Sequence, residues 1–245
     1  MAACSAALAS PAAAAPHTDK IRTESAGTFR NPIKRDAADP WIQFYQGSYY
    51  MTETRADRIT ITKASSVADL AAAPETMVWQ STAPNRCCNL WAPELHLVDG
   101  RWYLYYTDVD EPVAAAWGVH PRDTSHHRMY VLQSAGTDPL GPYTFKGVLN
   151  TTIEAFAIDG TMFERPDGSL YFIWSGASDA TSSAQNLYIA PMSNPWTISG
   201  SRVLLSEPTY DWERRPRPLA PASFAINEGP AVLQHDGRVF LTYSA

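Results

Sequence analysis

The sequence predicts an all-β fold of the propeller type, in which sheets are arranged radially around a channel. The first observation is a repeat: one pattern recurs four times, with a carboxylate, a short apolar strand, a turn containing glycine and a returning aromatic-rich strand. The second is a spacing of 55, 65 and 69 residues between the leading carboxylates Asp39, Glu94, Asp159 and Glu228. Such spacing indicates a repeat architecture, and four-stranded units of this size are typical of propeller blades.

Tight turns are expected inside each copy, at Gln46-Gly47, Asp99-Gly100, Asp167-Gly168 and Asp236-Gly237. These dipeptides tolerate the positive φ angles that short hairpins need. The returning strands, such as residues 102–107 and 170–175, are apolar or aromatic on both faces. That pattern is typical of strands that pack between neighbouring sheets.

A propeller places the innermost strand of every blade at the axis, so residues at equivalent strand starts form a ring at one end of the channel. We therefore expect Asp39, Glu94, Asp159 and Glu228 to meet there from one shared repeat position. Like charges in one cavity raise the pKa of at least one carboxyl group, and such groups are frequent in functional sites. The alternative is that each acid only accepts hydrogen bonds from exposed strand-end amides.

Other segments are assigned from local patterns. The alternation in residues 58–63 predicts a half-buried strand. We expect a helical turn at 64–73 and strands at 77–79, 129–134 and 187–192. A rigid turn is expected at 138–143. The long segment 108–128 is expected to be a functional or mobile loop, and the proline-rich segment 214–221 a rim loop. Only half of a fourth unit precedes residue 245, and an open edge strand is an aggregation hazard. We therefore expect the rest of the fourth blade and one further blade to be missing, and residues 1–245 alone to fold poorly.

Composition sets further limits. The chain has 245 residues, with eight Trp, twelve Tyr and only 18% charged residues. This many aromatic and few charged residues can form a sizeable core and surfaces on which sugars stack. The net charge of −6 argues against a nucleic-acid partner. No apolar run is as long as a membrane-spanning helix. We expect the protein to be a monomer and to have no nucleic-acid or membrane partner.

The N-terminal residues 1–16 are rich in alanine and resemble the end of an apolar signal region before small-residue cleavage sites. A basic start is missing, so either the leader is incomplete or the segment is a low-complexity tail. We expect secretion, with a signal remnant and linker at 1–30 and a partial propeller domain at 31–245.

Three cysteines are present: Cys4 in the expected leader and the adjacent pair Cys87-Cys88. Adjacent cysteines seldom bridge, because the geometry is strained. No zinc spacing is present, and His96 and His126-His127 show no metal-ligand pattern. Two buried thiols and one strained disulfide both remain open for the pair.

Four motifs in order carry a family resemblance. Asp-Pro-Trp at 39–41, Trp-Ala-Pro-Glu at 91–94, Ile-Asp-Gly at 158–160 and Asn-Glu-Gly-Pro at 227–230 resemble the blade starts of glycoside hydrolase family 43. These are five-bladed β-propeller enzymes that remove arabinose or xylose units from plant polysaccharides. The resemblance runs from about residue 31 to the end. Residues 38–42 and 58–61 look most like secreted exo-acting α-L-arabinofuranosidases of actinobacterial type.

By motif, the resemblance implies that Asp39 is the general base, that Glu228 is the general acid, and that Asp159 tunes the pKa of Glu228 and holds it in place. Like-charge repulsion from Asp159 is expected to raise the pKa of Glu228. Inverting glycosidases separate their two carboxyl groups by roughly 6.5–9.5 Å to admit a water molecule. Such a span fits opposite sides of a narrow channel.

Two tryptophans, Trp91 and Trp174, are candidates for lining the sugar pocket, and the alternative is that they are wedges between blades. Glu94 is assigned to the same substrate-binding set, with a structural role as its alternative. No cofactor is required. The resemblance also implies an ion such as calcium in the channel, held with help from a histidine of the last blade, which residues 1–245 do not supply.

Three alternatives remain. A β-xylosidase or endo-arabinanase keeps the fold and changes the sugar or the mode of cleavage. Fructan-cleaving propellers are disfavoured, because their Asn-Asp-Pro-Asn-Gly and Arg-Asp-Pro motifs have no counterpart here. A non-catalytic propeller that binds carbohydrate or protein is the third, and the three acids retained at the ring positions argue against it.

Overall fold

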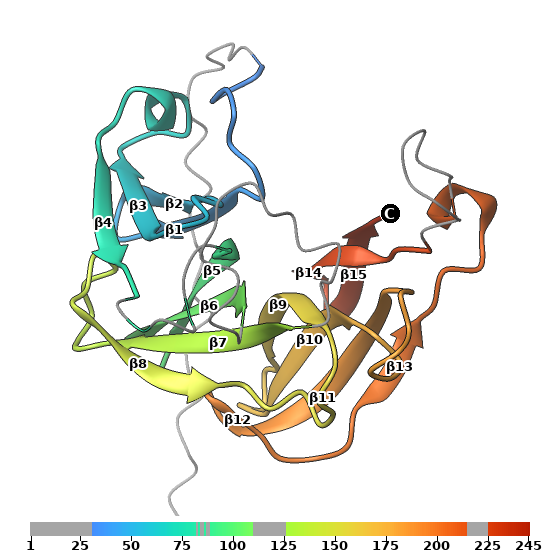
Figure 1. Cartoon of the computed structure of the whole chain (residues 1–245). Coiled ribbons are helices and arrows are strands. Elements are labelled where there is room, and N and C mark those ends of the chain that lie inside the picture. Colours follow the sequence, from blue (N-terminus) through green and yellow to red (C-terminus); the bar gives the residue numbers. More distant parts are fainter. Residues whose placement is uncertain (1–30, 82, 84–85, 87–88, 110–125, 215–224) are drawn as a thin grey trace, which may run out of the picture. The chain divides into compact units, whose positions relative to one another are not determined.

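The computed structural model describes residues 31–81, 83, 86, 89–109, 126–214 and 225–245. Within these residues the strands form four sheets, and every paired strand is antiparallel to its neighbour (Figure 1). Several predictions fall outside the described residues. They concern the signal remnant and linker at 1–30, the residues Cys4, Cys87 and Cys88, and most of the loops at 108–128 and 214–221.

We call the four sheets blades 1 to 4, in chain order. Blade 1 contains β1 (Trp41–Tyr45), β2 (Ser48–Thr52), β3 (Ile59–Ala64) and β4 (Glu75–Trp79). Blade 2 contains β5 (Trp91–Val98), β6 (Arg101–Val109), β7 (His127–Ser134) and β8 (Tyr143–Val148). Blade 3 contains β9 (Ala157–Glu164), β10 (Leu170–Gly176), β11 (Asn186–Asn194), β12 (Thr197–Ile198) and β13 (Val203–Ser206). Blade 4 contains β14 (Glu228–His235) and β15 (Arg238–Ser244).

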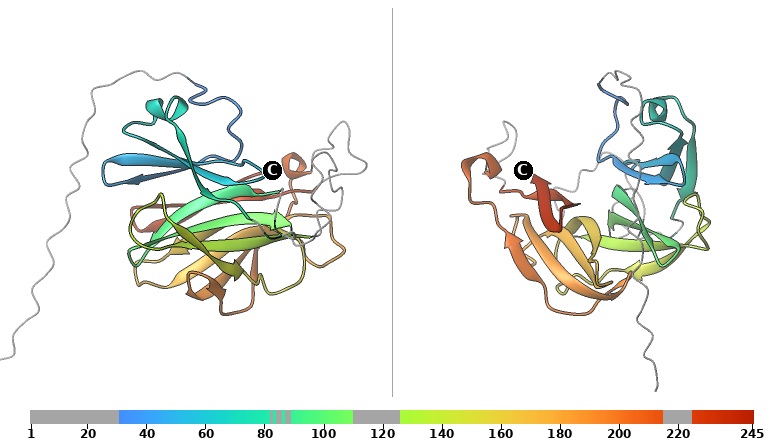
Figure 2. Two further views of the ribbon diagram at one scale, coloured as in Figure 1. Left: turned by 60° about the vertical axis from the view of Figure 1, so that its left-hand side comes forward. Right: turned by 180° about the vertical axis from the view of Figure 1, so that it is seen from behind.

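The first strands of consecutive blades pack against each other. β1 contacts β5, β5 contacts β9, and β9 contacts β14. Two further views show the same strands from other sides (Figure 2). Strands that are adjacent in sequence also pair within each blade, as in blade 2, where the order is β5-β6-β7-β8. This connectivity is that of a β-propeller, so the predicted fold class is confirmed.

Three of the four predicted tight turns have the expected backbone. Both residues of Gln46-Gly47, Asp99-Gly100 and Asp236-Gly237 have positive φ, between 46° and 78°. The Asp167-Gly168 turn is different, because β9 ends at Glu164 and β10 begins at Leu170. Only Gly168 has a positive φ there, and the loop is closed by a hydrogen bond from Arg165 N to Ser169 O.

The middle strands are buried on both faces. Eight of the nine residues of β6 are buried, as the aromatic pattern of 102–107 predicts. For β3, however, the predicted half-buried alternation is wrong, because five of its six residues are buried. The reason is its place inside the blade, between β2 and β4, where neighbouring sheets cover both sides.

Aromatic clusters fill the spaces between blades. Trp102 and Leu104 of blade 2 pack with Ile61 of blade 1. Tyr105 of blade 2 packs with Phe172 of blade 3, and its hydroxyl donates to Pro195 O at 2.6 Å. Burial of each such side chain stabilises the fold by about 1.5–3 kcal/mol.

The shorter elements agree with the predictions for blades 1 to 3. A 3₁₀ helix, η1 (Ala68–Ala71), lies in the expected helical turn, and β4, β7 and β11 include the expected strands. A second 3₁₀ helix, η3 (Asp211–Glu213), precedes blade 4. In the described part of the chain, no helix has the length and apolar character needed to cross a bilayer.

Candidate active site

The innermost strands of blades 2, 3 and 4 begin with the same β-bulge, and in blade 1 the same offset lies just before β1, where Thr54 N donates to Ala38 O. In blade 2, Trp91 and Glu94 are three positions apart, whereas their partners on β6, Thr107 and Tyr105, are two positions apart. Blades 3 and 4 show the same offset, which begins at Ile158 and at Glu228. The extra residue has a left-handed backbone in every blade, with φ of 51° at Asp39, 42° at Ala92, 51° at Asp159 and 60° at Gly229. Asp and Gly are among the residues that tolerate this conformation best.

The bulge shows that the expected single repeat position is wrong. Asp39 and Asp159 are equivalent, because each is the left-handed residue of its blade. Glu228 lies one residue before the left-handed Gly229, and Glu94 lies two residues after Ala92. The bulge is the same in each blade, so the acids differ in which of its positions they occupy, and the repeat spacing in the sequence did not reveal this.

The four carboxylates nevertheless lie close enough to interact. Burial raises the pKa of Asp159 to about 7, and the negative charges of Glu228, Asp39 and Glu94 contribute to the increase. A hydrogen bond from Gly229 N to Asp159 Oδ2, 3.1 Å long, opposes it. The structure therefore brings together the acids that the repeat predicted at one end of the inner strands.

A raised pKa is found at Asp159, and the increase expected at Glu228 stays a prediction. Burial is the largest cause at Asp159, and repulsion by Glu228 comes second. Repulsion acts on both members of a carboxylate pair, so ionisation of one opposes ionisation of the other.

Asp39 is exposed and is held by a hydroxyl group. Thr54 Oγ1 donates to Asp39 Oδ2 at 2.6 Å. Thr54 Oγ1 also accepts a hydrogen bond from Ala92 N of blade 2 at 2.8 Å. Thr54 lies two residues beyond the end of β2. The first candidate acid is therefore tied to the start of the neighbouring blade.

Thr54 belongs to a series of hydroxyl residues that sequence reasoning missed. The residues opposite the bulges are Thr54, Thr107, Ser175 and Ser244. Thr107 Oγ1 accepts from Asp159 N at 3.3 Å, and Ser175 Oγ donates to Asn227 O at 2.8 Å. A signal was present, because three of the four repeats end on one of these residues, although none of them is a titratable group.

Glu94 lies further along β5, paired with a histidine. Its Oε2 is 2.8 Å from His96 Nε2, and the two side chains are 13% and 11% exposed. Burial raises the pKa of Glu94, and the contact with His96 opposes the increase. Glu94 contributes to the shared field of the ring.

The two tryptophans have different environments. Trp91 is half-buried, and its ring stacks on His127 with centroids 4.1 Å apart. It also packs against a cluster at the start of blade 3 that includes Phe156. Trp174 is 1% exposed and stacks on Phe172 in the core between blades 2 and 3. Trp174 is therefore a wedge between blades, and the prediction that it lines the sugar pocket is wrong.

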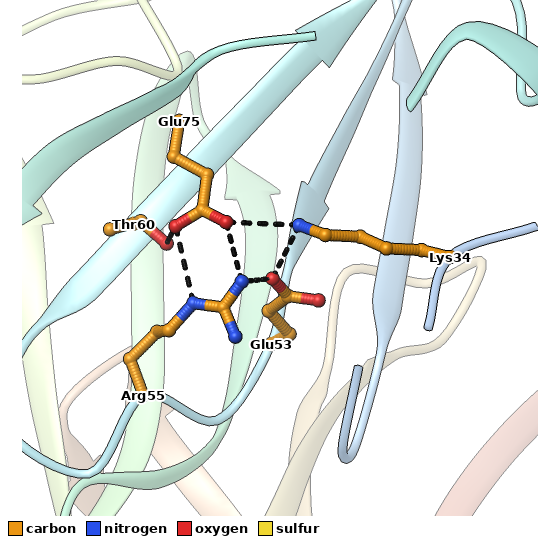
Figure 3. Close-up of polar contacts among 5 residues, drawn as sticks. All are labelled: Lys34, Glu53, Arg55, Thr60 and Glu75. Atoms are coloured by element: carbon orange, nitrogen blue, oxygen red, sulfur yellow. Dashed lines mark hydrogen bonds and ion pairs between the residues drawn. The ribbon is translucent and has the colours of Figure 1, made fainter. Parts of the chain in front are cut away.

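An ionic network fixes the segment that carries Asp39 (Figure 3). Lys34, five residues before Asp39, contacts Glu53 at 2.6 Å and Glu75 at 3.0 Å. Arg55 binds the same two carboxylates, and the Glu53 side chain is 1% exposed. The network ties the chain before Asp39 to the residues on both sides of Thr54.

The structure gives no ligand set for the expected ion. Among the residues with described positions, no three His, Cys, Asp or Glu side chains converge in a way that could hold a metal. The channel ion therefore stays a prediction, and no chemical step is assigned to it.

The arrangement is suited to acid and base chemistry. Asp39, Asp159 and Glu228 come from three blades, and the charges of Asp39 and Glu228 act on the Asp159 carboxyl group. Pairs of carboxyl groups in different environments are typical of glycosidases, in which one acts as an acid and the other as a base.

Comparisons with known proteins show what the chain is similar to. The chain is 40% identical over 223 residues to an extracellular exo-α-(1→5)-L-arabinofuranosidase of Streptomyces avermitilis, covering 89% of the chain and 43% of that protein. It is 34% identical to a Streptomyces chartreusis protein of the same name, covering 89% of the chain and 62% of that protein. The chain thus spans between about two fifths and three fifths of these relatives.

A solved structure is also similar. The α-L-arabinofuranosidase of Lactobacillus brevis matches with a TM-score of 0.76 and 35% identity, covering 88% of this chain and 65% of that one. An endo-arabinase of Bacteroides thetaiotaomicron, 17% identical with a TM-score of 0.69, shares the fold. The family model of glycosyl hydrolases family 43 matches residues 29–245. The chain therefore belongs to glycosyl hydrolases family 43.

Proposed function

We propose that the protein is a secreted, inverting exo-glycosidase that releases L-arabinofuranose from arabinan or arabinoxylan-type plant polysaccharides. The observation that carries this proposal is the meeting of Asp39, Asp159 and Glu228 in one field at the starts of three inner strands. The names of the Streptomyces and Lactobacillus relatives support the sugar and the exo mode of cleavage.

In the proposed reaction, a water molecule attacks the anomeric carbon of the terminal sugar. Asp39 takes a proton from this water while the bond from carbon to the leaving oxygen breaks, and Glu228 gives its proton to that oxygen. Removing either group should cost roughly 10²–10⁴-fold in rate, the usual contribution of general acid–base catalysis.

Asp159 is assigned to tuning. Its carboxylate accepts from Gly229 N, the amide that directly follows Glu228, so it fixes the backbone that carries the proposed acid. Repulsion between the two carboxyl groups also opposes ionisation of both at once, so it favours a proton on one of them. Trp91 is assigned to the wall of the sugar pocket, because a half-buried ring beside the ring of acids suits the apolar face of a sugar.

The proposed location is extracellular. Two relatives are named extracellular, and the alanine-rich residues 1–16 resemble the end of a signal region.

The test compares leaving groups in the full-length protein. Glu228→Gln should lose at least about 10²-fold in kcat/KM on an alkyl α-L-arabinofuranoside, whose leaving oxygen needs protonation. The loss on the 4-nitrophenyl glycoside should be much smaller, because nitrophenolate leaves without help. Asp39→Asn should lose activity on both substrates alike, since the water must be deprotonated in either case.

Three results would contradict the proposal. Near-normal rates for both variants on the alkyl glycoside would remove the assigned roles. Faster cleavage of the β-D-xyloside than of the arabinofuranoside would show that the protein is a β-xylosidase, and internal cleavage of linear arabinan would show endo action.

A further inference from the structure

The Thr54 hydroxyl group lies between two fixed partners. Its oxygen accepts from Ala92 N at 2.8 Å, and its proton is donated to Asp39 Oδ2 at 2.6 Å. A hydroxyl group has one proton to give. Because blade 2 holds the oxygen, the direction of that proton is set.

Asp39 needs such a partner because of where it lies. Its side chain is exposed, and its backbone is left-handed with φ of 51°. An exposed carboxylate that makes no fixed bond rotates between rotamers. The bond to Thr54 selects one orientation and leaves Oδ1 as the oxygen that can receive a proton.

The equivalent residues of the next two blades have different partners. Thr107 accepts from Asp159 N and contacts Met129 Sδ at 3.5 Å. Ser175 donates to Asn227 O of blade 4. The bonds to Asp159 N and Asn227 O join neighbouring blades through backbone groups, and the Met129 contact lies within blade 2. In blade 1 the hydroxyl proton goes instead to a carboxylate that is a candidate for catalysis.

The segment around Thr54 is also fixed from both sides. Glu53 and Arg55 belong to the ionic network with Lys34 (Figure 3). Lys34 lies on the stretch that leads into Asp39, so the same network fixes the carboxylate and the hydroxyl group that holds it.

We propose that Thr54 is a positioning residue for the reaction: its hydroxyl group holds Asp39 so that Oδ1 faces the attacking water. This proposal rests on the proposed function, in which Asp39 accepts the proton of that water. The proton moves to Asp39 Oδ1 as the new carbon–oxygen bond forms, and the proton of Glu228 moves to the leaving oxygen. Thr54 keeps its own proton throughout.

The test uses valine and serine at position 54 in the full-length protein. Thr54→Val keeps the shape and removes the hydroxyl group, whereas Thr54→Ser keeps the hydroxyl group. A misplaced catalytic group typically costs up to about 10²-fold. We expect Thr54→Val to lower kcat on 4-nitrophenyl α-L-arabinofuranoside by roughly 10- to 100-fold with KM within about twofold, and Thr54→Ser to keep at least about a third of the wild-type kcat.

Thr52→Val is the matched control. Thr52 lies on β2, is fully buried and donates from its hydroxyl group to Pro93 O, next to Ala92 on the same neighbouring segment. Its loss also removes a bond between blades 1 and 2, but without touching an acid. We expect Thr52→Val to lower the melting temperature at least as much as Thr54→Val, with kcat within about twofold of wild type.

Sodium azide separates positioning from structure. Azide is a nucleophile that carries no proton, so it needs no general base. Added azide should raise the rate of Thr54→Val and of Asp39→Asn with formation of the glycosyl azide, and it should leave Thr52→Val unchanged.

The outcomes are distinct. A wild-type kcat in Thr54→Val, or equal losses in Thr54→Val and Thr52→Val with no response to azide, overturns the role of Thr54. If Asp39→Asn itself keeps the wild-type rate, the proposed function fails instead, because Asp39 is then not the base.

Discussion

Asp39 and Asp159 occupy the same bulged position in blades 1 and 3, with φ of 51° at each. They nevertheless differ in surroundings, because Asp39 is exposed while Asp159 is partly buried and accepts a backbone amide. The same bulged backbone thus presents two aspartate side chains to one site, one exposed and one partly buried. That difference is the basis of the roles assigned to them.

The pH dependence of stability should report the Asp159 carboxyl group. Its pKa is about 7 in the folded protein, against 3.8 as the ordinary value. The folded state therefore holds a proton that the unfolded state releases, and stability falls as the pH rises from about 4 to 7. Asp159→Asn lacks this loss. Urea unfolding at pH 4.5, 6 and 8 should show the variant gaining stability relative to wild type as the pH rises, and a constant difference would contradict the assignment.

The ionic network should show the opposite sign. Burial alone would raise the pKa of Glu75, but hydrogen bonds from Lys34, Arg55 and Thr60 lower it to about 2. Its contribution is present above pH 4.5 and is lost as the pH falls towards 2. Because Glu75 is partly exposed, we expect Glu75→Gln to cost no more than about 1 kcal/mol at pH 7, and the difference from wild type to shrink in unfolding measurements at lower pH.

Glu53 should matter more than Glu75. Its side chain is 1% exposed and binds both Lys34 and Arg55. Removing it leaves two cations without a buried partner, so Glu53→Ala should cost about 3 kcal/mol. Because the network fixes the stretch before Asp39, kcat should fall as well. A variant with lower stability in urea and an unchanged kcat would show that the network does not act on the site.

Replacing Trp174 and replacing Trp91 should have different effects. Trp174→Ala removes a wedge in the core and should cost about 3–5 kcal/mol of stability. Trp91→Ala should instead lower kcat/KM by roughly tenfold, or about 1.4 kcal/mol of transition-state binding, with a smaller change in stability. Unfolding curves and kinetics of the folded fraction distinguish the two, and an unchanged kcat/KM for Trp91→Ala would remove it from the pocket.

Close packing between blades 2 and 3 can be tested by a change in stability. A Cβ added at Gly160 would collide with the Phe172 ring and lie 2.8 Å from Met129 Cε. Gly160→Ala should therefore cost about 1–3 kcal/mol. A melting temperature equal to that of wild type would show that these blades pack more loosely than described.

The fold could be predicted from the sequence because each blade repeats the same local signals. An acidic start, a glycine turn such as Asp99-Gly100 and an aromatic strand such as 102–107 act locally, so they are visible in the chain. The burial of β3 on both faces could not be read in the same way, because it depends on which sheets cover the strand.

The site was only partly predictable for the same reason. The acids Asp39, Asp159 and Glu228 stand out as titratable groups at repeat starts. Glu228 stands one position earlier in its bulge than Asp159 does, and the motif spacing did not reveal this difference. Thr54 and Trp174 show the other limit: a hydroxyl partner or a buried wedge is defined by its neighbours in space, not by its residue type.

The stereochemistry of hydrolysis tests the central claim most directly. If Asp39 activates water opposite a bond that Glu228 protonates, the full-length protein inverts the anomeric carbon in one displacement. Proton NMR of the first turnovers on 4-nitrophenyl α-L-arabinofuranoside should then show β-L-arabinofuranose before mutarotation. Initial formation of the α-anomer would mean a covalent intermediate on a carboxylate, and it would contradict the roles assigned to the ring of acids.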